Sequence, residues 1–537
     1  MCHIGAAGTF RQVVAYPSRG NRAAGLESVM SPDPQAEVIA LLAAPATHGG
    51  TAPERIDTHI SSVFLAGDRA YKLKKAVRLP FLDFSTLEAR RAACEAELAL
   101  NRLTAPDLYI EVAAVTRRPG GGLGLGGEGE AVDYLVVMRR FASDTLFDRL
   151  AERGALDRRL VEDLTEAVVR FHGVAPVRGD RGGAAGLKWT VDTNEMSMLA
   201  QVPAILPANG VRRLTELSRA WLDRLGPMLD ERRERGLVRR CHGDLHLGNI
   251  CLFEGRPTLF DAIEFSEDIA CIDVFYDLAF LLMDLDVHRS RPLASMALNH
   301  ALDLTGDYQA VAALPLFLSL RAAVRCHVAA TIAAQAEGDD ITRRAAEARA
   351  YLIAALDYLA PPRPRLVAVG GLSGSGKSRM GRRLAPLLAV PGAVVVRSDA
   401  VRKQVMGVGL KDRLGPEGYT GAVTRRTYRT MLETCAMLLS AGHPVIADAV
   451  FAKPEQRAAI EDVARRAGVP FDGLWLEVNP EVGKERIAAR VGNASDATPE
   501  VLEQQLGYDL GEIGWTRIDT APVGEAAFTA ACHRLGV

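Results

Sequence analysis

The sequence predicts two domains, an α+β domain followed by an α/β domain with a parallel sheet. Hairpin and helix patterns at 56–103 precede mostly helical patterns up to residue 359, and strand-like and helix-like runs alternate from residue 366 onward. Strands grouped before helices are typical of α+β folds, and alternation is typical of parallel sheets. Three prolines in four residues at 361–364 separate the two patterns. The expected segments are a disordered leader or misassigned start at 1–29, the first domain at 30–359, a linker at 360–365 and the second domain at 366–537.

Size and composition are those of an ordinary soluble globular protein. A chain of 537 residues, 48% apolar and 24% charged, exceeds what one hydrophobic core serves. The net charge of -2, from 64 basic and 66 acidic residues, provides no global attraction to nucleic acid or anionic membranes. Eight scattered cysteines and the lack of an eighteen-residue apolar run predict a cytoplasmic protein with reduced thiols and no membrane partner.

Local patterns predict the elements of the first domain in order. Strands at 61–65 and 70–73 surround a turn at 66–69, and a capping box at Ser85–Glu88 begins a helix that runs to residue 103. The remaining elements are strands at 109–117 and 132–141 and helices at 144–174, 211–235, 277–286 and most of 293–359.

In the second domain, an apolar strand at 365–369 leads through a glycine-rich loop into a helix at 378–388. Further strands are expected at 393–396, 444–447 and 473–478, with helices between them.

The first chemical motif is the loop His242–Asn249, which pairs Asp244 with Asn249 five residues later. A strand at 250–253, a turn and a strand at 258–265 follow, and this hairpin can return Asp261 to the side of Asn249. Phosphoryl transfer needs an acceptor for the hydroxyl proton and oxygen ligands for magnesium. Asp244 suits the first task, and Asn249 and Asp261 suit the second. The alternative is a polar loop whose Asp and Asn satisfy their own backbone.

With these residues the chain resembles, over 56–355, the aminoglycoside phosphotransferase and choline kinase branch of the protein-kinase-like fold. The resemblance implies a nucleotide-binding lysine paired with a glutamate; Lys72 and Glu97 are preferred, and Lys74 and Glu95 are the alternatives. Where protein kinases have a glycine-rich loop, this chain has Thr58–Ser62, which leaves a non-catalytic module open. The GxGxxG match at 122–127 does not open a helix in a βαβ unit and is interpreted as a flexible turn.

The second chemical motif is a complete Gly-x4-Gly-Lys-Ser phosphate loop between a strand and a helix. Lys377 is expected to reach the β and γ phosphates and Ser378 to ligate magnesium, while the alternative is a flexible glycine turn. The loop residues that are expected to bind ATP are Gly371, Leu372, Ser373, Gly374, Ser375, Gly376, Lys377 and Ser378.

Acidic and basic residues after the next strands complete this second candidate site. Asp399 ends a strand and is a candidate proton acceptor. With Arg402 it forms a D-x-x-R pattern similar to that of small phosphate-loop kinases of the polynucleotide 5′-kinase, gluconate kinase and chloramphenicol phosphotransferase types, which implies that Arg402 binds substrate or phosphate. Asp448 is either a second acidic group near magnesium or a helix cap. Arg486 and Arg490 share one helix face of a lid-like segment, where the alternative is a solvated basic face.

Together the motifs predict an ATP- and Mg²⁺-dependent enzyme that transfers the γ-phosphate to a hydroxyl of a small molecule. The whole arrangement resembles bacterial proteins described as bifunctional aminoglycoside phosphotransferase and ATP-binding proteins; antibiotic resistance does not follow from that resemblance. Three alternatives remain: a C-terminal kinase with a nucleotide-sensing N-terminal module, an NTPase switch, and a less favoured polynucleotide 5′-kinase. The last predicts a basic groove around Arg402, Arg425, Arg426 and Arg429.

Overall fold

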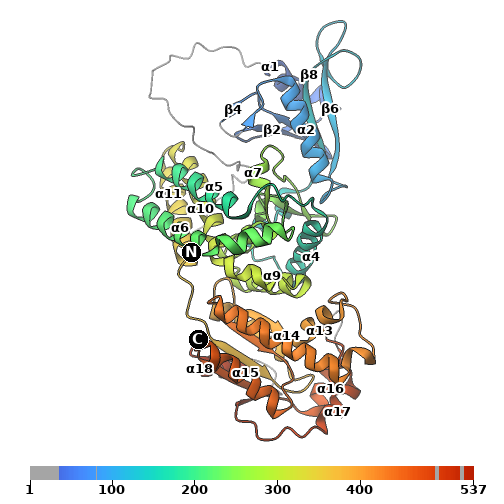
Figure 1. Cartoon of the computed structure of the whole chain (residues 1–537). Helices are drawn as coiled ribbons and strands as arrows, with labels where there is room; N and C mark the ends of the chain where they lie inside the picture. Colours follow the sequence, from blue (N-terminus) through green and yellow to red (C-terminus); the bar gives the residue numbers. More distant parts are fainter. Residues whose placement is uncertain (1–34, 80–81, 490–494, 521–524) are drawn as a thin grey trace. The chain divides into compact units, whose positions relative to one another are not determined.

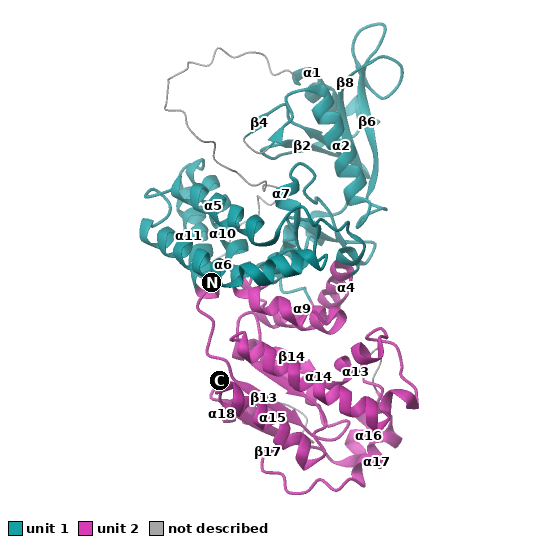
Figure 2. Cartoon of the chain, in the orientation of Figure 1, with its two compact units in different colours: residues 1–156, 170–284, 316–356 teal, residues 157–169, 285–315, 357–537 magenta. Residues whose placement is uncertain are grey.

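The computed structural model describes residues 35–79, 82–489, 495–520 and 525–537 (Figure 1). The predicted leader at 1–29 lies outside these residues. The chain forms two compact units, coloured separately in Figure 2. Unit 1 comprises the described residues of Met1–Leu156, Arg170–Asp284 and Leu316–Leu356, and unit 2 those of Asp157–Val169, Leu285–Pro315 and Asp357–Val537.

Unit 1 contains a six-stranded antiparallel sheet in the order β1-β2-β3-β8-β6-β7. The predicted hairpin is confirmed, since β2 and β3 pair across a two-residue turn. The segment 122–127 is not simply a turn, because its central residues form β7. The strands are β1 (Glu54–Asp57), β2 (Ser61–Ala66), β3 (Arg69–Lys74), β6 (Tyr109–Arg117), β7 (Leu123–Leu125) and β8 (Glu130–Arg139), and a separate hairpin consists of β4 (Arg78–Leu79) and β5 (Leu82–Asp83).

Alternation along β3 decides which side chains reach the site. Leu73 packs with α1 (Ala36–Ala43) in a cluster on one face of the sheet. Lys72, whose strand partner Val136 belongs to the cluster on the other face, lies on the side of α2 (Leu87–Asn101). Because residues two apart on a strand share a face, Lys74 lies on that side as well.

The helical part of unit 1 differs from the prediction in two places. The helix expected at 144–174 is interrupted after Glu152, where Gly154 adopts a φ of 67°, and α5 was not predicted. The element bounds here are η2 (Ser143–Thr145), α3 (Phe147–Glu152), α4 (Arg158–Val174, shared between the units), α5 (Gly183–Leu199), α6 (Ala208–Glu234), α7 (Glu267–Ala270), α8 (Val274–Val287), α10 (Leu314–Ala334) and α11 (Asp339–Tyr358).

Among the described residues, the helical stretch Tyr308–Ala334 is long and apolar enough to cross a membrane by length and composition alone. Within the structure 94% of its apolar window is buried, which is the behaviour of a core helix.

Unit 2 is built on a five-stranded parallel sheet in the order β14-β15-β13-β16-β17, which confirms the predicted α/β class. Alternate residues of the strands form a core with α12 and α18, while α14 and α15 contact the sheet without joining that core. Strand β17 was not predicted. The bounds are β13 (Leu366–Gly370), α12 (Lys377–Leu388), β14 (Val394–Arg397), α13 (Ser398–Met406), η5 (Pro416–Tyr419), α14 (Gly421–Ser440), β15 (Val445–Asp448), α15 (Pro454–Ala467), β16 (Phe471–Glu477), α16 (Pro480–Ala488), α17 (Pro499–Leu506), β17 (Thr516–Asp519) and α18 (Ala526–Leu535).

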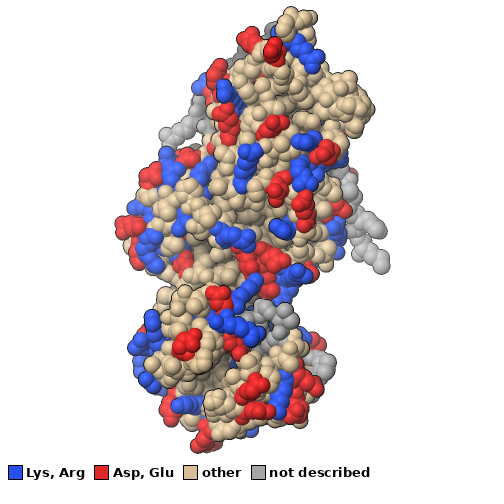
Figure 3. Space-filling view, turned by 90° about the vertical axis from the view of Figure 1, so that its right-hand side faces the viewer, with Lys and Arg blue, Asp and Glu red and all other residues tan. Residues whose placement is uncertain are grey.

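Unit 2 also includes α9 (Arg291–Thr305) and η4 (Tyr308–Ala313), which precede the predicted linker in the sequence. Helix α9 contacts α12, α13 and β14. The linker 360–365 itself contains neither helix nor strand. On the face shown in Figure 3, acidic and basic side chains are interspersed.

Candidate functional site

In unit 1, two carboxylates of α8 accept hydrogen bonds from the backbone of the loop His242–Asn249. Asp277 accepts hydrogen bonds from the backbone amides of His242 (3.2 Å) and Gly243 (2.9 Å), and Asp284 accepts one from Leu247 (2.9 Å). Both carboxylates are buried. Hydrogen bonds that amides donate to a charged acceptor are among the stronger ones in proteins, so the loop backbone is firmly placed.

Asp244 is ionised at neutral pH. Burial by itself raises the pKa of this carboxyl. The nearby His246, whose Nε2 lies 3.4 Å from Oδ2, together with His242 and Arg325 outweighs that effect and lowers the pKa to about 2. Asn249 Nδ2 donates to the carboxylate and to the carbonyl oxygen of Asp244, both at 3.0 Å. The side chain of Asn249 thus bonds within the loop, as expected for a polar loop whose Asp and Asn satisfy their own backbone. The carboxylate of Asp244 can still accept further hydrogen bonds.

The hairpin of β10 (Ile250–Phe253) and β11 (Arg256–Leu259) brings Asp261 back beside the loop. The amide of Phe260 donates to the carbonyl of Asn249 (3.0 Å), which places Asp261 one residue away. The predicted strand at 258–265 is wrong beyond Leu259, because Asp261 takes a left-handed conformation (φ 61°) that ends the strand. Its amide donates to the hydroxyl of Tyr109 (3.1 Å).

Both candidate lysines of β3 bind the same glutamate of α2. Lys72 Nζ lies 2.8 Å from Glu97 Oε1 and 2.5 Å from Asp261 Oδ1. Lys74 Nζ lies 2.6 Å from Glu97 Oε2 and also pairs with Glu264. Burial raises the pKa of Glu97, but the two lysines outweigh it and lower the pKa to about 2. The structure thus joins Lys72 to the loop side of the site through Asp261, whereas Lys74 is completely buried.

The alternative glutamate, Glu95, does not take part in this cluster. It is exposed and pairs with Arg91 one helical turn away. The bond from Lys72 to Asp261 joins residues 189 positions apart, and only the tertiary fold could reveal it.

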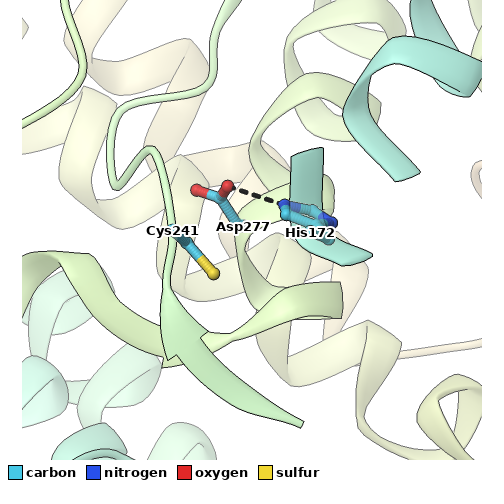
Figure 4. A group of neighbouring side chains, drawn as sticks. All are labelled: His172, Cys241 and Asp277. Carbon is cyan, nitrogen blue, oxygen red and sulfur yellow. Dashed lines mark hydrogen bonds and ion pairs between the residues drawn. The ribbon is translucent and has the colours of Figure 1, made fainter. Parts of the chain in front are cut away.

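A second group of side chains in unit 1, His172, Cys241 and Asp277, has ligand atoms within 4.8 Å of one another (Figure 4). His172 Nε2 donates to Asp277 Oδ2 (2.9 Å), and the Cys241 thiol donates to the carbonyl of Ile272 (3.5 Å). Burial, together with the nearby acidic charges, raises the pKa of the Cys241 thiol. A protonated thiol is a poor metal ligand, so we interpret the group as hydrogen-bonded support for the loop.

In unit 2, the phosphate loop connects β13 to α12, as the sequence predicted. A Cβ on Gly374 (φ 83°) would lie 2.6 Å from the carbonyl oxygen of Gly483 in α16, whereas a Cβ on Gly376 (φ 89°) would meet nothing within 4 Å. The loop is therefore packed against the lid-like segment at one glycine and open at the other. Lys377 Nζ donates to the carbonyl of Leu372 (2.9 Å).

Ser378 and Asp448 lie together at the start of α12. Ser378 Oγ donates to Asp448 Oδ2 at 2.6 Å. Asp448 ends β15, and the N-cap of the following helix is Lys453, so the helix-cap alternative for Asp448 does not apply. Burial raises the pKa of Asp448, while Lys377, Arg397 and the hydrogen bond from Ser378 oppose that rise.

Asp399 and Arg402 lie on α13, which begins where β14 ends. Asp399 is in the first turn and is partly exposed. Arg402 is buried, donates to the carbonyl of Gly418 (2.8 Å) and lies over the ring of Tyr419 (4.8 Å). In this structure Arg402 thus anchors the segment at 416–424, and its expected contact with substrate or phosphate stays a prediction.

The lid-like segment reaches the phosphate loop through residues that the sequence did not reveal. Arg486 donates to the carbonyl of Thr520 (2.7 Å), and the hydroxyl of Thr520 donates to the carbonyl of Ser375 (3.0 Å). The side chain of Gln505 accepts a hydrogen bond from the amide of Ser373 (2.8 Å). Neither Thr520 nor Gln505 belongs to a motif, so no local signal identified them. Arg490 lies outside the described residues.

Two different protein families match two separate segments of the chain. Residues 61–314 match the family model described as phosphotransferase enzyme family, and residues 366–508 match the one described as AAA domain. An uncharacterized protein of Mycobacterium tuberculosis is 29% identical over 493 residues, which cover 89% of this chain and 94% of that protein.

Solved structures with similar segments have low similarity scores. A choline/ethanolamine kinase family protein from Mesorhizobium loti has a TM-score of 0.38 at 16% identity and covers 61% of this chain and 99% of that chain. The APS kinase CysC of Mycobacterium tuberculosis, solved with AMPPNP and APS, has a TM-score of 0.26 at 21% identity and covers 33% of this chain and 100% of that chain. The two family models match one segment before the linker and one after it, so the chain combines a segment similar to the phosphotransferase enzyme family with one similar to the AAA domain family.

Proposed function

We propose that this two-domain kinase-like protein transfers the γ-phosphate of Mg-ATP to hydroxyl groups of small molecules at two separate sites. One observation supports the proposal in both units. A lysine lies beside a loop together with side chains whose oxygen atoms could bind a cation, and these residues come from distant parts of the sequence. In unit 1 these are Lys72 with Asp261, and in unit 2 Lys377 with Ser378 and Asp448. Both constellations suit a triphosphate with a hard divalent cation.

In unit 1, Lys72 would bind the phosphates of ATP while Glu97 holds its ammonium group in place. Asn249 and Asp261 would hold Mg²⁺, which neutralises the charge of the triphosphate when it is bound. Asp244, ionised at neutral pH, would accept the hydrogen of the acceptor hydroxyl and orient its oxygen. A carboxylate with a pKa of about 2 is a weak base, so this role is mainly one of positioning.

In unit 2, backbone amides of the loop would hold the phosphates, and the open side of Gly376 leaves room for them. Lys377 would exchange the carbonyl of Leu372 for phosphate oxygens. Ser378 and Asp448 offer only oxygen donors, the set that Mg²⁺ prefers. Asp399, partly exposed at the carboxyl end of the sheet, would accept the proton of the hydroxyl that is phosphorylated at the unit 2 site.

The decisive experiment is a transfer screen with γ-³²P-labelled ATP and a fractionated metabolite extract. It compares the wild type with Asp244→Ala and Lys377→Ala, and with Glu95→Gln as a control on the exposed face of α2. Each of the first two variants is expected to abolish a different set of labelled products, while the control retains both sets. If neither variant removes any labelled product, phosphoryl transfer at these sites is wrong.

A second candidate for unit 1 is a nucleotide-sensing module without transfer activity. It is favoured by the turn that stands where protein kinases have a glycine-rich loop: the amide and the hydroxyl of Thr58 both donate to the carbonyl of Ser61, and Lys75 donates to the carbonyl of Thr58. A short, internally bonded turn covers little of a triphosphate. Lys72-dependent binding of Mg-ATP without any Asp244-dependent product would favour this candidate.

A further inference from the structure

Three polar residues of α9, spaced four apart, face the edge strand of the unit 2 sheet. A Cβ on Gly392, just before β14, would lie 2.0 Å from Ser295 Oγ, so the helix and the chain touch there. Asn299 bonds β14 itself, and Asp303 pairs with Arg397 at its end. Residues four apart lie on one helix face. One stripe of α9 therefore follows the strand along its whole length.

Asn299 replaces a missing strand partner at that edge. Its Nδ2 donates to the carbonyl of Ala393 (3.1 Å), and its Oδ1 accepts from the amide of Val395 (2.7 Å). Strand β14 is the outermost strand of the sheet, and a side chain that satisfies its free backbone groups covers an exposed edge. The helix is thereby fixed in register with β14, and that register sets the position of Asp303.

Asp303 in turn holds Arg397, which lies next to the candidate magnesium ligand. Arg397 Nη1 lies 2.8 Å from Asp303 Oδ2, and both side chains are only 4% exposed. Arg397 Nε lies 3.9 Å from Asp448 Oδ2, and Arg397 and Asp448 are paired residues of neighbouring parallel strands. Among the described residues, Arg397 Nε has no hydrogen-bond partner. The guanidinium thus binds Asp303 and only approaches Asp448.

We propose that Asp303 is a positioning residue for the cation of the phosphate loop: it holds Arg397 and offsets its charge, so that Asp448 remains available to Mg²⁺. This inference rests on the function proposed for unit 2. Helix α9, which precedes the linker in the sequence, would then contribute a positioning residue to the phosphate-loop site.

The physical reason is competition for one carboxylate. A buried guanidinium beside Asp448 repels a divalent cation and attracts the same oxygen atoms that the cation needs. The Arg397–Asp303 ion pair is neutral as a whole, and its geometry directs the hydrogen bond of Arg397 away from Asp448. Without the charge of Asp303, Arg397 would turn to Asp448 as the nearest remaining carboxylate.

The test measures Mg²⁺-dependent binding of mant-ATP to the full-length chain by fluorescence, counting only the signal that Lys377→Ala abolishes. Asp303→Asn is expected to raise the Mg²⁺ concentration at half-maximal binding by about tenfold. Removing the arginine as well, in Asp303→Asn/Arg397→Gln, is expected to return it to the wild-type value or below. The matched control is Asp472→Asn, which breaks a short ion pair with Arg365 (2.6 Å) elsewhere in unit 2.

The outcomes separate this inference from the proposed function. Absence of any Lys377-dependent mant-ATP signal in the wild type contradicts the function proposed for unit 2. A normal wild-type signal with the same Mg²⁺ midpoint in Asp303→Asn as in Asp472→Asn overturns the role of Asp303. If Asp303→Asn does not fold, the double variant decides, since a midpoint about tenfold above the wild type would also overturn it.

Discussion

Replacing Lys72 and Lys74 separately by methionine distinguishes a nucleotide-binding lysine from a structural one. Lys72 is 13% exposed, and its second partner, Asp261, is 36% exposed. Lys74 is 0% exposed, and its second partner, Glu264, is 5% exposed. Either substitution leaves Glu97 with one lysine. The difference between the variants therefore comes from the carboxylate that each lysine leaves behind.

The exposure of the carboxylate left behind decides how much stability each variant loses. Removing one partner from a buried ion pair costs about 3–5 kcal/mol because a charge is left without compensation, and Lys74→Met leaves Glu264 in that state. Water reaches Asp261, so Lys72→Met should cost only about 1–2 kcal/mol. The double variant Lys74→Met/Glu264→Gln removes both charges and should recover most of the loss. Nucleotide binding should show the reverse order, with Lys72→Met the more damaging.

Amide hydrogen exchange is the suitable assay, because the two units need not unfold together and a single unfolding curve would mix them. Protection of the amides of β3 reports the opening of unit 1 alone. Lys74→Met is expected to lower this protection by a factor of about a hundred to several thousand, since each 1.4 kcal/mol is about tenfold. Lys72→Met should lower it by about tenfold.

Mant-ATP binding in a Lys377→Ala background reports on the nucleotide site proposed for unit 1. The reasoning is refuted if the two variants lose equal protection, or if Lys74→Met abolishes binding while Lys72→Met retains it. Equal protection would mean that the burial of the abandoned carboxylate does not set the cost, and the second result would mean that Lys74 rather than Lys72 binds the phosphates.

Three further predictions follow from single contacts. The pKa of Asp244 is lowered from 3.8 to about 2, so its ionised form stabilises unit 1 by about 2 kcal/mol above pH 4. This contribution disappears as the pH falls from about 4 to 2, and the stability of Asp244→Asn should therefore fall less over that range. An equal loss of stability between pH 4 and 2 in the variant and the wild type contradicts the prediction. Gly374→Ala should lower the melting temperature more than Gly376→Ala, because only the former Cβ collides with Gly483, and equal melting temperatures would contradict the packing. The isolated segment 360–537 lacks α9 and should aggregate through β14 in light-scattering measurements; a monodisperse segment with wild-type mant-ATP affinity would show that α9 is dispensable.

The sequence predicted elements well where the chain is punctuated by strong local signals. The hairpin of β2 and β3, the helix after Thr86 and the phosphate loop between β13 and α12 are all confirmed. Prediction failed where a single residue changes the backbone: Asp261 ends a strand by adopting a positive φ, and Gly154 interrupts a helix. The backbone of Asp261 bonds the distant Tyr109, which local propensity does not contain. Gly154 ends α3 through bonds between neighbouring residues, such as that from the amide of Ala155 to the carbonyl of Leu150, so this miss is an overlooked local glycine signal.

The candidate sites were predictable as motifs but not as constellations. The period of a strand puts Lys72 and Lys74 on one face, and only the structure shows that both bind Glu97 and that Lys72 alone reaches Asp261. The helix-cap alternative for Asp448 could be discarded only when the structure showed that Lys453 is the N-cap of the following helix. Thr520 and Gln505 support the phosphate loop without belonging to any pattern.

By itself, the sequence determined the two fold classes and the place of the two loop motifs, because turns, caps and glycine-rich loops are encoded by neighbouring residues. Only the tertiary structure decided which charges meet, since ion pairs such as Lys72 with Asp261 join residues 189 positions apart. It also decided that α9 covers the edge of the second sheet, where Asn299 bonds Val395 of β14, 96 residues later. Contacts of this kind depend on how whole elements pack, and packing is a property of the complete fold.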